Sequence, residues 1–194
     1  MNNNQNSPLF LIVTMLSFIF FSCNNGGDKS LQLKKNSLVD NIGDTFRLQN
    51  IIDISGNQVQ LDFSKTEFTV IDFWFNSCPP CVEEMKQFSE VLAGKETKIS
   101  IISISINQFW IWKPTMTNPP ERFSFLKNTS PSWTQYALKS FEDENLKNEI
   151  STDREKEIQG LYNITFFPAY FVVDKNGIII QRPVSAVQFI RDYK

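Results

Sequence analysis

The sequence contains no histidine in its 194 residues. This absence excludes zinc sites built on histidine, Cys–His nucleophile pairs, and copper sites that need cysteine and histidine together. The charges are nearly balanced, with 19 Lys and Arg against 21 Asp and Glu, so that the net charge is only −2. Such a chain has no basis for binding a polyanion, and we expect no nucleic-acid partner. There are three cysteines, and because a second Cys or His pair is missing we also expect no metal site.

The N-terminal region carries an apolar run, Leu9–Phe21, that is short for a membrane span and suits the apolar part of a signal peptide. It closes on a small residue and Cys23, after which the sequence becomes polar. This pattern resembles a bacterial lipoprotein signal, although the first residues lack Lys and Arg. We therefore expect residues 1–23 to be a signal whose Cys23 is lipidated, and residues 24–38 to be a flexible spacer. An uncleaved anchor and an ordinary signal cut near Ser22 stay open, and each alternative takes the domain out of the cytoplasm.

The centre of the sequence joins a strand pattern to a helix pattern through two cysteines. Thr69–Phe75 is β-branched and aromatic, as a central strand needs, and Pro80–Ala93 repeats apolar residues at spacings of three and four before Gly94. Cys78 and Cys81 lie at the junction. A cysteine at a helix N-terminus lies near unpaired N–H groups that favour the thiolate, which is the attacking species. The second cysteine, one turn further on, is close enough to resolve a mixed disulfide.

The residues around these cysteines resemble those of the thioredoxin superfamily. Asp72–Trp74 reads Asp-Phe-Trp, Cys78–Cys81 reads Cys-Pro-Pro-Cys, and Glu84 follows the second cysteine at the third position. This combination is similar to the membrane-tethered thiol–disulfide reductases of the TlpA/ResA type, and the resemblance covers roughly residues 41–182. It implies an α/β, thioredoxin-like fold over residues 39–194. In that fold a central mixed sheet is flanked by helices, with an extra N-terminal β-hairpin and here an enlarged insert after the second central strand.

The other expected elements follow from local patterns of apolar residues and turn residues. The hairpin has Gly56 in its turn, and Asn176-Gly177 marks a second turn before an edge strand. The expected strands are Thr45–Ile54, Gln58–Phe63, Ile99–Ile106, Ala169–Asp174 and Ile178–Arg182, and the expected helices are Phe141–Ile150, Ser151–Tyr162 and Ser185–Tyr193.

The insert, at about residues 107–150, is irregular because its prolines break any long regular element. It contains Trp110, Trp112 and Trp133. These aromatic side chains either line a groove beside the cysteines for a particular partner or cap the core beneath a long loop. We favour the second interpretation, because large aromatic side chains mainly pack. The 18 phenylalanines of the chain likewise indicate an aromatic core rather than an exposed groove.

The two motif cysteines are the expected catalytic residues. Cys78 is the proposed nucleophile and should be the more exposed thiol, while Cys81 is the proposed resolving thiol. The alternative is a permanently oxidised structural disulfide, but a bridge that closes so short a loop adds little chain-entropy stabilisation. Pro79 and Pro80 stiffen the turn, and we place them among the substrate-binding residues. Pro80 suits the first helical turn, where its missing N–H has no effect.

Two carboxyl groups are candidates for proton transfer. Asp72 lies in an apolar strand, so that burial would raise its pKa and let it accept a proton from Cys81 and return it later. The alternative is a carboxylate that points to a polar edge. Glu84 lies one turn past Cys81, and by resemblance it assists proton transfer or orients a partner. It is equally interpreted as a solvated helix residue.

The remaining site residues come from the resemblance. Pro168 matches the proline that is cis in the thioredoxin superfamily and faces the two cysteines, and the residue before it, here Phe167, pairs with the bound substrate chain. An ordinary trans proline at a strand start is the alternative. Trp74 matches an aromatic residue that packs under the active-site loop, and we include it among the substrate-binding residues. Ser77 departs from the family, where Trp commonly precedes the first cysteine, and its small side chain should open one side of the site.

The function implied is an extracytoplasmic thiol–disulfide oxidoreductase that reduces disulfides of cell-envelope proteins. It needs no cofactor beyond the Cys78–Cys81 disulfide, receives electrons from a membrane donor, and is a monomer held at the membrane by a lipid anchor. A lipoprotein that keeps the fold as a binding scaffold but exchanges electrons poorly is the main alternative. A thiol peroxidase is disfavoured, because the Pro-x-x-x-Thr-x-x-Cys context is missing before Cys78.

Overall fold

The computed structural model describes residues 41–95, 98–139 and 152–193. The expected signal with Cys23, the spacer of residues 24–38 and the expected helix Phe141–Ile150 lie outside the described residues. In the described part of the chain, no helix combines the length and the apolar character that a bilayer crossing requires.

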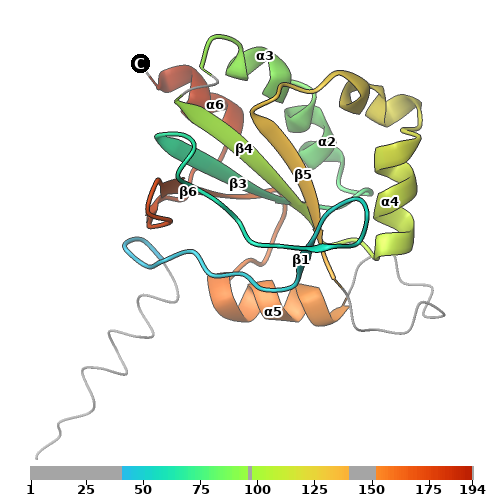
Figure 1. Cartoon of the computed structure of the whole chain (residues 1–194), viewed down its shortest axis with the longest axis horizontal. Coiled ribbons are helices and arrows are strands. Elements are labelled where there is room, and N and C mark those ends of the chain that lie inside the picture. The colour runs from blue at the N-terminus through green and yellow to red at the C-terminus, as the bar shows by residue number, and fades with distance from the viewer. Residues whose placement is uncertain (1–40, 96–97, 140–151, 194) are drawn as a thin grey trace, which may run out of the picture.

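A seven-stranded mixed sheet forms the centre of the domain, as the family resemblance predicts (Figure 1). Its strand order is β2-β1-β5-β4-β3-β6-β7, with β3, β4 and β5 parallel and the other pairs antiparallel. The strands are β1 (Ile51–Ile52), β2 (Gln58–Val59), β3 (Phe68–Trp74), β4 (Ile99–Ser105), β5 (Trp133–Leu138), β6 (Ala169–Asp174) and β7 (Ile179–Gln181).

Three adjacent strands confirm the sequence pattern, because β3, β4 and β6 fall on the expected segments. They are rich in β-branched and aromatic residues and are almost wholly buried, as strands covered on both faces should be. The edge strand β7 follows the turn at Gly177, whose φ of 77° is in the left-handed region that favours glycine. The N-terminal hairpin also forms, although β1 and β2 are only two residues long.

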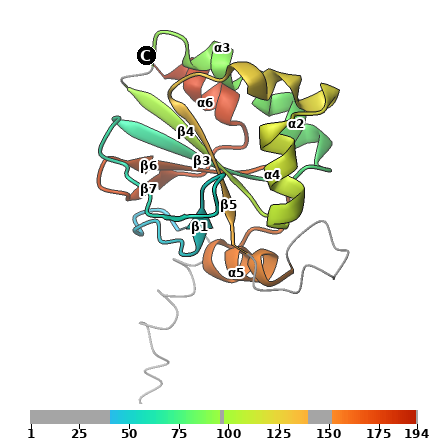
Figure 2. The same ribbon diagram turned by 45° about the vertical axis from the view of Figure 1, so that its right-hand side comes forward.

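Helices cover the two faces of the sheet unequally, as Figures 1 and 2 show. One face packs the majority of the helices and the cysteine motif, and the other packs α5 together with the segment before β1. The helices are α2 (Pro79–Met85), α3 (Phe88–Leu92), α4 (Phe109–Thr117), a 3₁₀ helix (Glu121–Asn128), α5 (Thr152–Tyr162) and α6 (Ala186–Asp192).

The helix expected over Pro80–Ala93 is divided into α2 and α3. The Gln87 N–H bonds to the Glu84 carbonyl, three residues back, at 3.0 Å, which tightens the chain between the two helices. The expected apolar face is nevertheless correct, because Cys81, Met85 and Phe88 are all buried against the sheet.

The insert is more regular than the sequence predicts. It contains α4, whose interior includes Pro114, and it supplies β5, which pairs with β4 and β1 inside the sheet. Trp112 and Trp133 are 0% and 4% exposed, so these two aromatic side chains pack in the core, in agreement with the second interpretation of the insert. Trp110 is 42% exposed and does not belong to this buried set.

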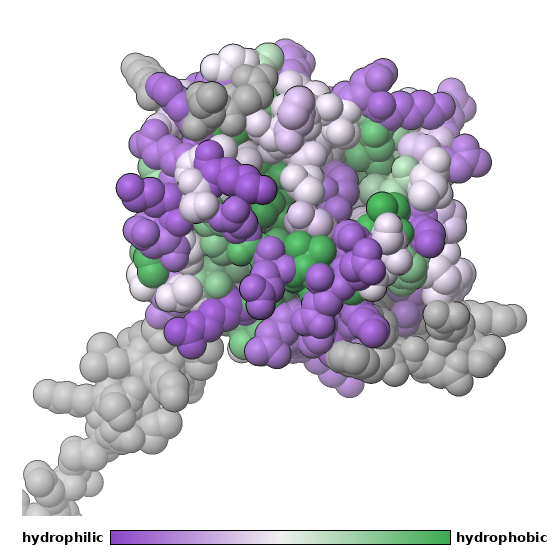
Figure 3. Space-filling view, viewed as in Figure 1, coloured by the Kyte–Doolittle hydropathy of each residue, from purple (hydrophilic) through white to green (hydrophobic). Residues whose placement is uncertain are grey.

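Aromatic side chains also fill the core on the α5 face. Phe46 stacks on Tyr162 with ring centroids 4.9 Å apart, and Phe73 meets Phe171 edge to face. In the view of Figure 3 polar residues cover most of the surface, and apolar residues appear as separate patches. Most of the described phenylalanines pack in or against the core.

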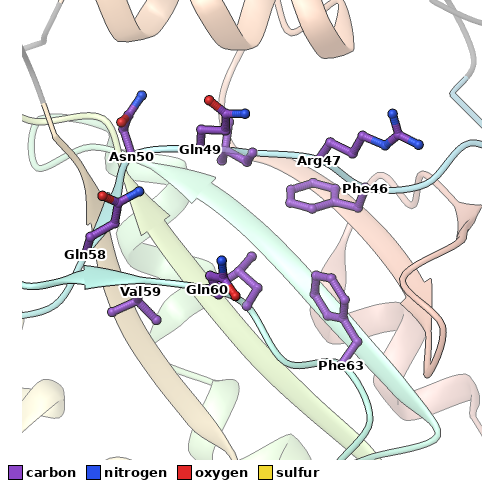
Figure 4. A pocket seen from close by; sticks show the side chains of 10 residues that line it. Phe46, Arg47, Gln49, Asn50, Gln58, Val59, Gln60 and Phe63 are labelled. Carbon is purple, nitrogen blue, oxygen red and sulfur yellow. The ribbon is translucent and has the colours of Figure 1, made fainter.

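The N-terminal segment opens a groove of about 400 Å³ at the sheet edge. Figure 4 shows that its walls come from the extended segments Phe46–Asn50 and Gln58–Phe63, with several amide side chains at the rim. None of its lining residues belongs to the cysteine motif, so we do not place the active site there.

Candidate active site

The cysteine motif begins α2 at the end of β3, as the sequence predicts. Cys78 and Cys81 form a disulfide, with their Cα atoms 5.3 Å apart. Cys78 is the N-cap residue, with extended backbone, and its Sγ accepts a hydrogen bond from the Cys81 N–H at 3.3 Å. A prolyl residue opens the helix, where no N–H is needed. One amide of this first turn, the Cys81 N–H, therefore reaches the Cys78 sulfur, and at a helix N-terminus this bond stabilises a thiolate once the bridge is reduced.

The two sulfurs differ slightly in their access to solvent. Cys78 is 3% exposed, whereas Cys81 is completely buried, which agrees with the expectation that Cys78 is the more accessible thiol. The neighbouring residues Ser77, Pro79 and Pro80 are all exposed, so the surface around the motif is open. An external thiol or disulfide must therefore approach from the Cys78 side.

An aromatic pair connects the motif to the proline loop. The Phe167–Pro168 peptide bond is cis, as the resemblance predicts. Phe73 pairs with Ala169 across β3 and β6, which places Pro168 at the level of the residues that lead to the cysteines. Phe75 and Phe167 meet edge to face, with ring centroids 5.3 Å apart. Phe167 also packs against the core cluster that contains both cysteines, so the proline loop and the motif lie side by side.

Asp72 is fully buried in β3 on the face that carries α2, because it alternates with Val70 and Trp74 of the same core cluster. The alternative of a carboxylate at a polar edge is therefore wrong. Its Oδ2 accepts a hydrogen bond from the Ser103 hydroxyl at 2.7 Å. Burial raises the pKa of Asp72 to about 7, with the Ser103 hydrogen bond lowering it and the charge of Glu84 adding to the rise.

Glu84 is half-buried and tied to two other elements. Its Oε2 accepts from the Tyr170 hydroxyl at 2.7 Å, and its Oε1 accepts from the Ser185 hydroxyl at 2.5 Å and from the Val187 N–H at 2.9 Å. The interpretation of Glu84 as a freely solvated residue is therefore wrong. Burial, with the nearby charges of Asp72 and Glu84, raises the pKa of the Tyr170 phenol, so this hydroxyl stays protonated and donates. Glu84 connects α2 with β6 and with the start of α6.

A buried network of amides supports the loop before Cys78. Asn107 Oδ1 accepts from the Asn76 N–H at 2.8 Å and from the Ser105 hydroxyl at 2.9 Å, and the Asn76 side-chain amide donates to Thr115 Oγ1 at 2.7 Å. These bonds attach the loop to the end of β4 and to α4. These three hydrogen bonds offset the cost of burying the Asn76 N–H, the Asn76 side-chain NH₂ and Asn107 Oδ1.

Trp74 is too deeply buried to bind a substrate. It is completely buried and packs against Phe123 with ring centroids 5.9 Å apart, which agrees with its expected position under the loop. It has no exposed surface through which it contacts a substrate in this state, so we assign it to the core.

The sequence does not predict the side chains that bond to the two carboxyl groups, namely Ser103, Tyr170 and Ser185, or Trp133, whose indole N–H donates to Ser103 Oγ. The sequence could have indicated the partner of Asp72, because Ser103 is a polar residue within a strand whose apolar neighbours predict burial. Aligning β3 with β4 sets it opposite Asp72. The partners of Glu84 give no comparable signal, since they come from segments far along the chain.

Comparison with known proteins agrees with this geometry. A family model described as Redoxin matches residues 42–188. The thiol-disulfide oxidoreductase ResA of Bacillus cereus (strain ZK / E33L) is 23% identical over 137 residues, which cover 70% of this chain and 65% of the relative. The chain thus spans just under two thirds of the length of this curated relative.

Solved structures share the fold. The thioredoxin domain of a thiol-disulfide oxidoreductase from Bacteroides vulgatus is 21% identical, with a TM-score of 0.54 and coverage of 78% of this chain and 93% of that one. A thiol:disulfide interchange protein from Bacteroides sp. is 24% identical, with a TM-score of 0.56 and coverage of 77% and 85%. The fold, the motif and the family match together show that the chain belongs to the Redoxin family, as a TlpA/ResA-like member of the thioredoxin superfamily.

Proposed function

We propose that this protein is an extracytoplasmic thiol–disulfide oxidoreductase that reduces disulfides of other cell-envelope proteins. The observation that carries the proposal is the Cys78–Cys81 pair, set at the first turn of α2 beside the cis proline loop. The curated relatives named thiol-disulfide oxidoreductase ResA support the same activity.

The reaction starts from the reduced dithiol. The Cys78 thiolate attacks one sulfur of the substrate disulfide, and the other substrate sulfur leaves as a thiolate. Cys81 then gives up its proton and attacks Cys78, which forms the Cys78–Cys81 disulfide and releases the second substrate thiolate. The two electrons that reduce the substrate come from the dithiol, and a membrane dithiol donor restores it by the reverse exchange. The redox-active disulfide is the only cofactor required.

Asp72 is the proposed acid–base residue, and Glu84 is proposed to orient the motif. A carboxyl group with a pKa near 7 exchanges protons readily at neutral pH, and Asp72 meets this condition because it is buried. Asp72 therefore accepts the Cys81 proton and returns it when the disulfide is reduced again. Glu84 fixes α2 against β6 and α6 through its three hydrogen bonds, so that the motif keeps its position during exchange.

The substrate chain is proposed to lie along the proline loop. The backbone of Phe167 before Pro168 pairs with the extended substrate segment, and the exposed Pro79 and Pro80 border the approach to Cys78. Phe166, which is 75% exposed, adds an apolar surface to this edge. These features favour a protein segment over a small thiol as the substrate.

The cellular setting follows from the N-terminal sequence. Residues 1–23 as a lipoprotein signal, with lipidation of Cys23, would hold a monomeric domain at the membrane through the spacer. Outside the cytoplasm disulfides form and persist, so that a reductase there has substrates and needs a supply of electrons.

A trapping experiment tests the proposal. With Cys81→Ser, the mixed disulfide between Cys78 and the substrate is not resolved, so disulfide-linked complexes with envelope proteins should accumulate and disappear on reduction. The matched control is Cys78→Ser, which should form none. If Cys81→Ser captures nothing and the unmodified protein does not reduce insulin disulfides, the binding-scaffold alternative is favoured.

A further inference from the structure

A buried chain of hydrogen bonds reaches Asp72 from two neighbouring strands. The Trp133 indole Nε1–H donates to Ser103 Oγ at 2.9 Å, and the Ser103 hydroxyl donates to Asp72 Oδ2 at 2.7 Å. Asp72 and Ser103 are direct partners in the parallel register of β3 and β4. Asp72 and Ser103 are 0% exposed and Trp133 is 4% exposed, so the chain is shielded from solvent.

The chemistry of the three groups fixes the direction of this chain. An indole N–H only donates, so Ser103 Oγ must accept from Trp133. The single hydroxyl proton of Ser103 is then directed to Asp72 Oδ2. Such a bond favours the ionised carboxylate, because a hydroxyl donates more strongly to a charged acceptor.

The other carboxyl oxygen has a different environment. Asp72 Oδ1 is buried and has no hydrogen-bond partner among the described residues. A proton taken up by the carboxyl group therefore goes to Oδ1, because Oδ2 already accepts the Ser103 proton.

The titratable groups that face Asp72 come from two elements. Glu84 and the two cysteines lie along α2 and its N-cap, and Tyr170 lies on β6 opposite Asp72. The Tyr170 hydroxyl is occupied by Glu84, to which it donates. The buried faces of α4 and α6 carry only residues that do not titrate, namely Trp112, Thr115, Ala186, Val187 and Ile190. While Cys78 is held in the mixed disulfide with the substrate, Cys81 is thus the thiol that can give a proton to Asp72.

We propose that Ser103, oriented by Trp133, is a positioning residue that holds Asp72 so that Oδ1 receives the proton of the Cys81 thiol. This inference rests on the proposed function. In the resolving step the Cys81 S–H bond breaks, its proton goes to Oδ1, and the sulfur electron pair forms the bond to Cys78. The substrate sulfur leaves with the electrons of the broken mixed disulfide. When the donor reduces the bridge, Oδ1 returns the proton to Cys81.

The test follows the titration of the Asp72 carboxyl carbon by ¹³C NMR in the intact chain, with Asp72→Asn to identify the signal. Ser103→Ala should raise the Asp72 midpoint by about one pH unit or more, as expected for loss of a hydrogen bond to a charged group. The resolving step should then slow by about fivefold at pH 7, since the ionised fraction falls from about one half to about one tenth, and should recover at higher pH.

Three further variants make this result specific. Ser100 lies on the same strand as Ser103, and its hydroxyl bonds to Thr66 and Thr69 instead of Asp72. Ser100→Ala should therefore leave the Asp72 midpoint unchanged. Ser103→Thr keeps the donor and should restore the midpoint. If Ser103→Ala fails to fold, Trp133→Phe serves instead, because it removes the N–H that orients Ser103. It should move the midpoint upward by a smaller amount.

The outcomes separate the inference from the proposed function. An Asp72 midpoint that stays in place in both Ser103→Ala and Trp133→Phe overturns the inference, whatever the activity. A midpoint that moves as expected, in a protein that exchanges no disulfides, overturns the proposed function and leaves the positioning of Asp72 by Ser103 intact.

Discussion

Replacing Asp72 with Asn should change how the stability of the oxidised protein depends on pH. Asp72 is completely buried, and burial raises its pKa from 3.8 to about 7. At pH values between 3.8 and about 7, Asp72 is protonated in the folded state but has lost its proton in the unfolded state. The unfolding free energy contributed by this group is therefore greatest at low pH and declines as the pH rises through this window. Asn has no such titration, so the variant should lose this decline.

The size of the effect follows from the pKa difference. A rise from 3.8 to about 7 is about three pKa units, and at 1.36 kcal/mol per unit the whole decline is about 4 kcal/mol. About 3 kcal/mol of this loss of stability should occur between about pH 4.5 and about pH 8. The buried amide that Asp72→Asn introduces lacks a partner for its NH₂ group, and this lowers the stability of the variant by about 1–3 kcal/mol at every pH.

Urea denaturation of both oxidised proteins across this pH range measures the effect. The relevant quantity is the difference between the two proteins at each pH, because Asp53, Asp62 and Asp174 titrate alike in both. Their pKa values are lowered by hydrogen bonds within their own turns. The Asp72→Asn variant should gain about 3 kcal/mol relative to the unmodified protein from about pH 4.5 to about pH 8. Parallel stability curves would refute the claim that Asp72 is buried with a raised pKa.

Two further substitutions, each with a matched control, test the packing around the site. Glu84→Gln weakens three hydrogen bonds to α6 and β6 and should lower the unfolding free energy by about 1–3 kcal/mol, whereas Glu83→Gln, on the exposed side of the same helix, should change it by less than about 1 kcal/mol. Trp112→Ala opens a core cavity and should lower it by about 3–5 kcal/mol, whereas Trp110→Ala should have a much smaller effect. Urea denaturation measures the unfolding free energy of each variant. If the two variants of a pair lose the same amount of it, the buried member of that pair is not buried as described.

The fold is largely predictable where the pattern is local. The predicted bounds of β3, β4 and β6 lie within one residue of the observed ones, because an apolar β-branched run bounded by turn residues leaves few alternatives. The insert is less predictable. Pro114 indicates a break, yet α4 continues through it, and Trp133 begins a strand that becomes part of the sheet by pairing with β4 and β1. Such pairing depends on residues far away in the sequence.

For the site, the sequence by itself determined the two cysteines, the helix that begins after Cys78, and the proline at position 168. Each of these features is indicated by neighbouring residues, because their types allow few backbone conformations. Only the tertiary structure decided which groups surround the two carboxylates. Ser103 is 31 residues from Asp72, and Ser185 is 101 residues from Glu84. These contacts require the strand register and the docking of α6, which arise from packing of the whole core and leave no trace in a local pattern.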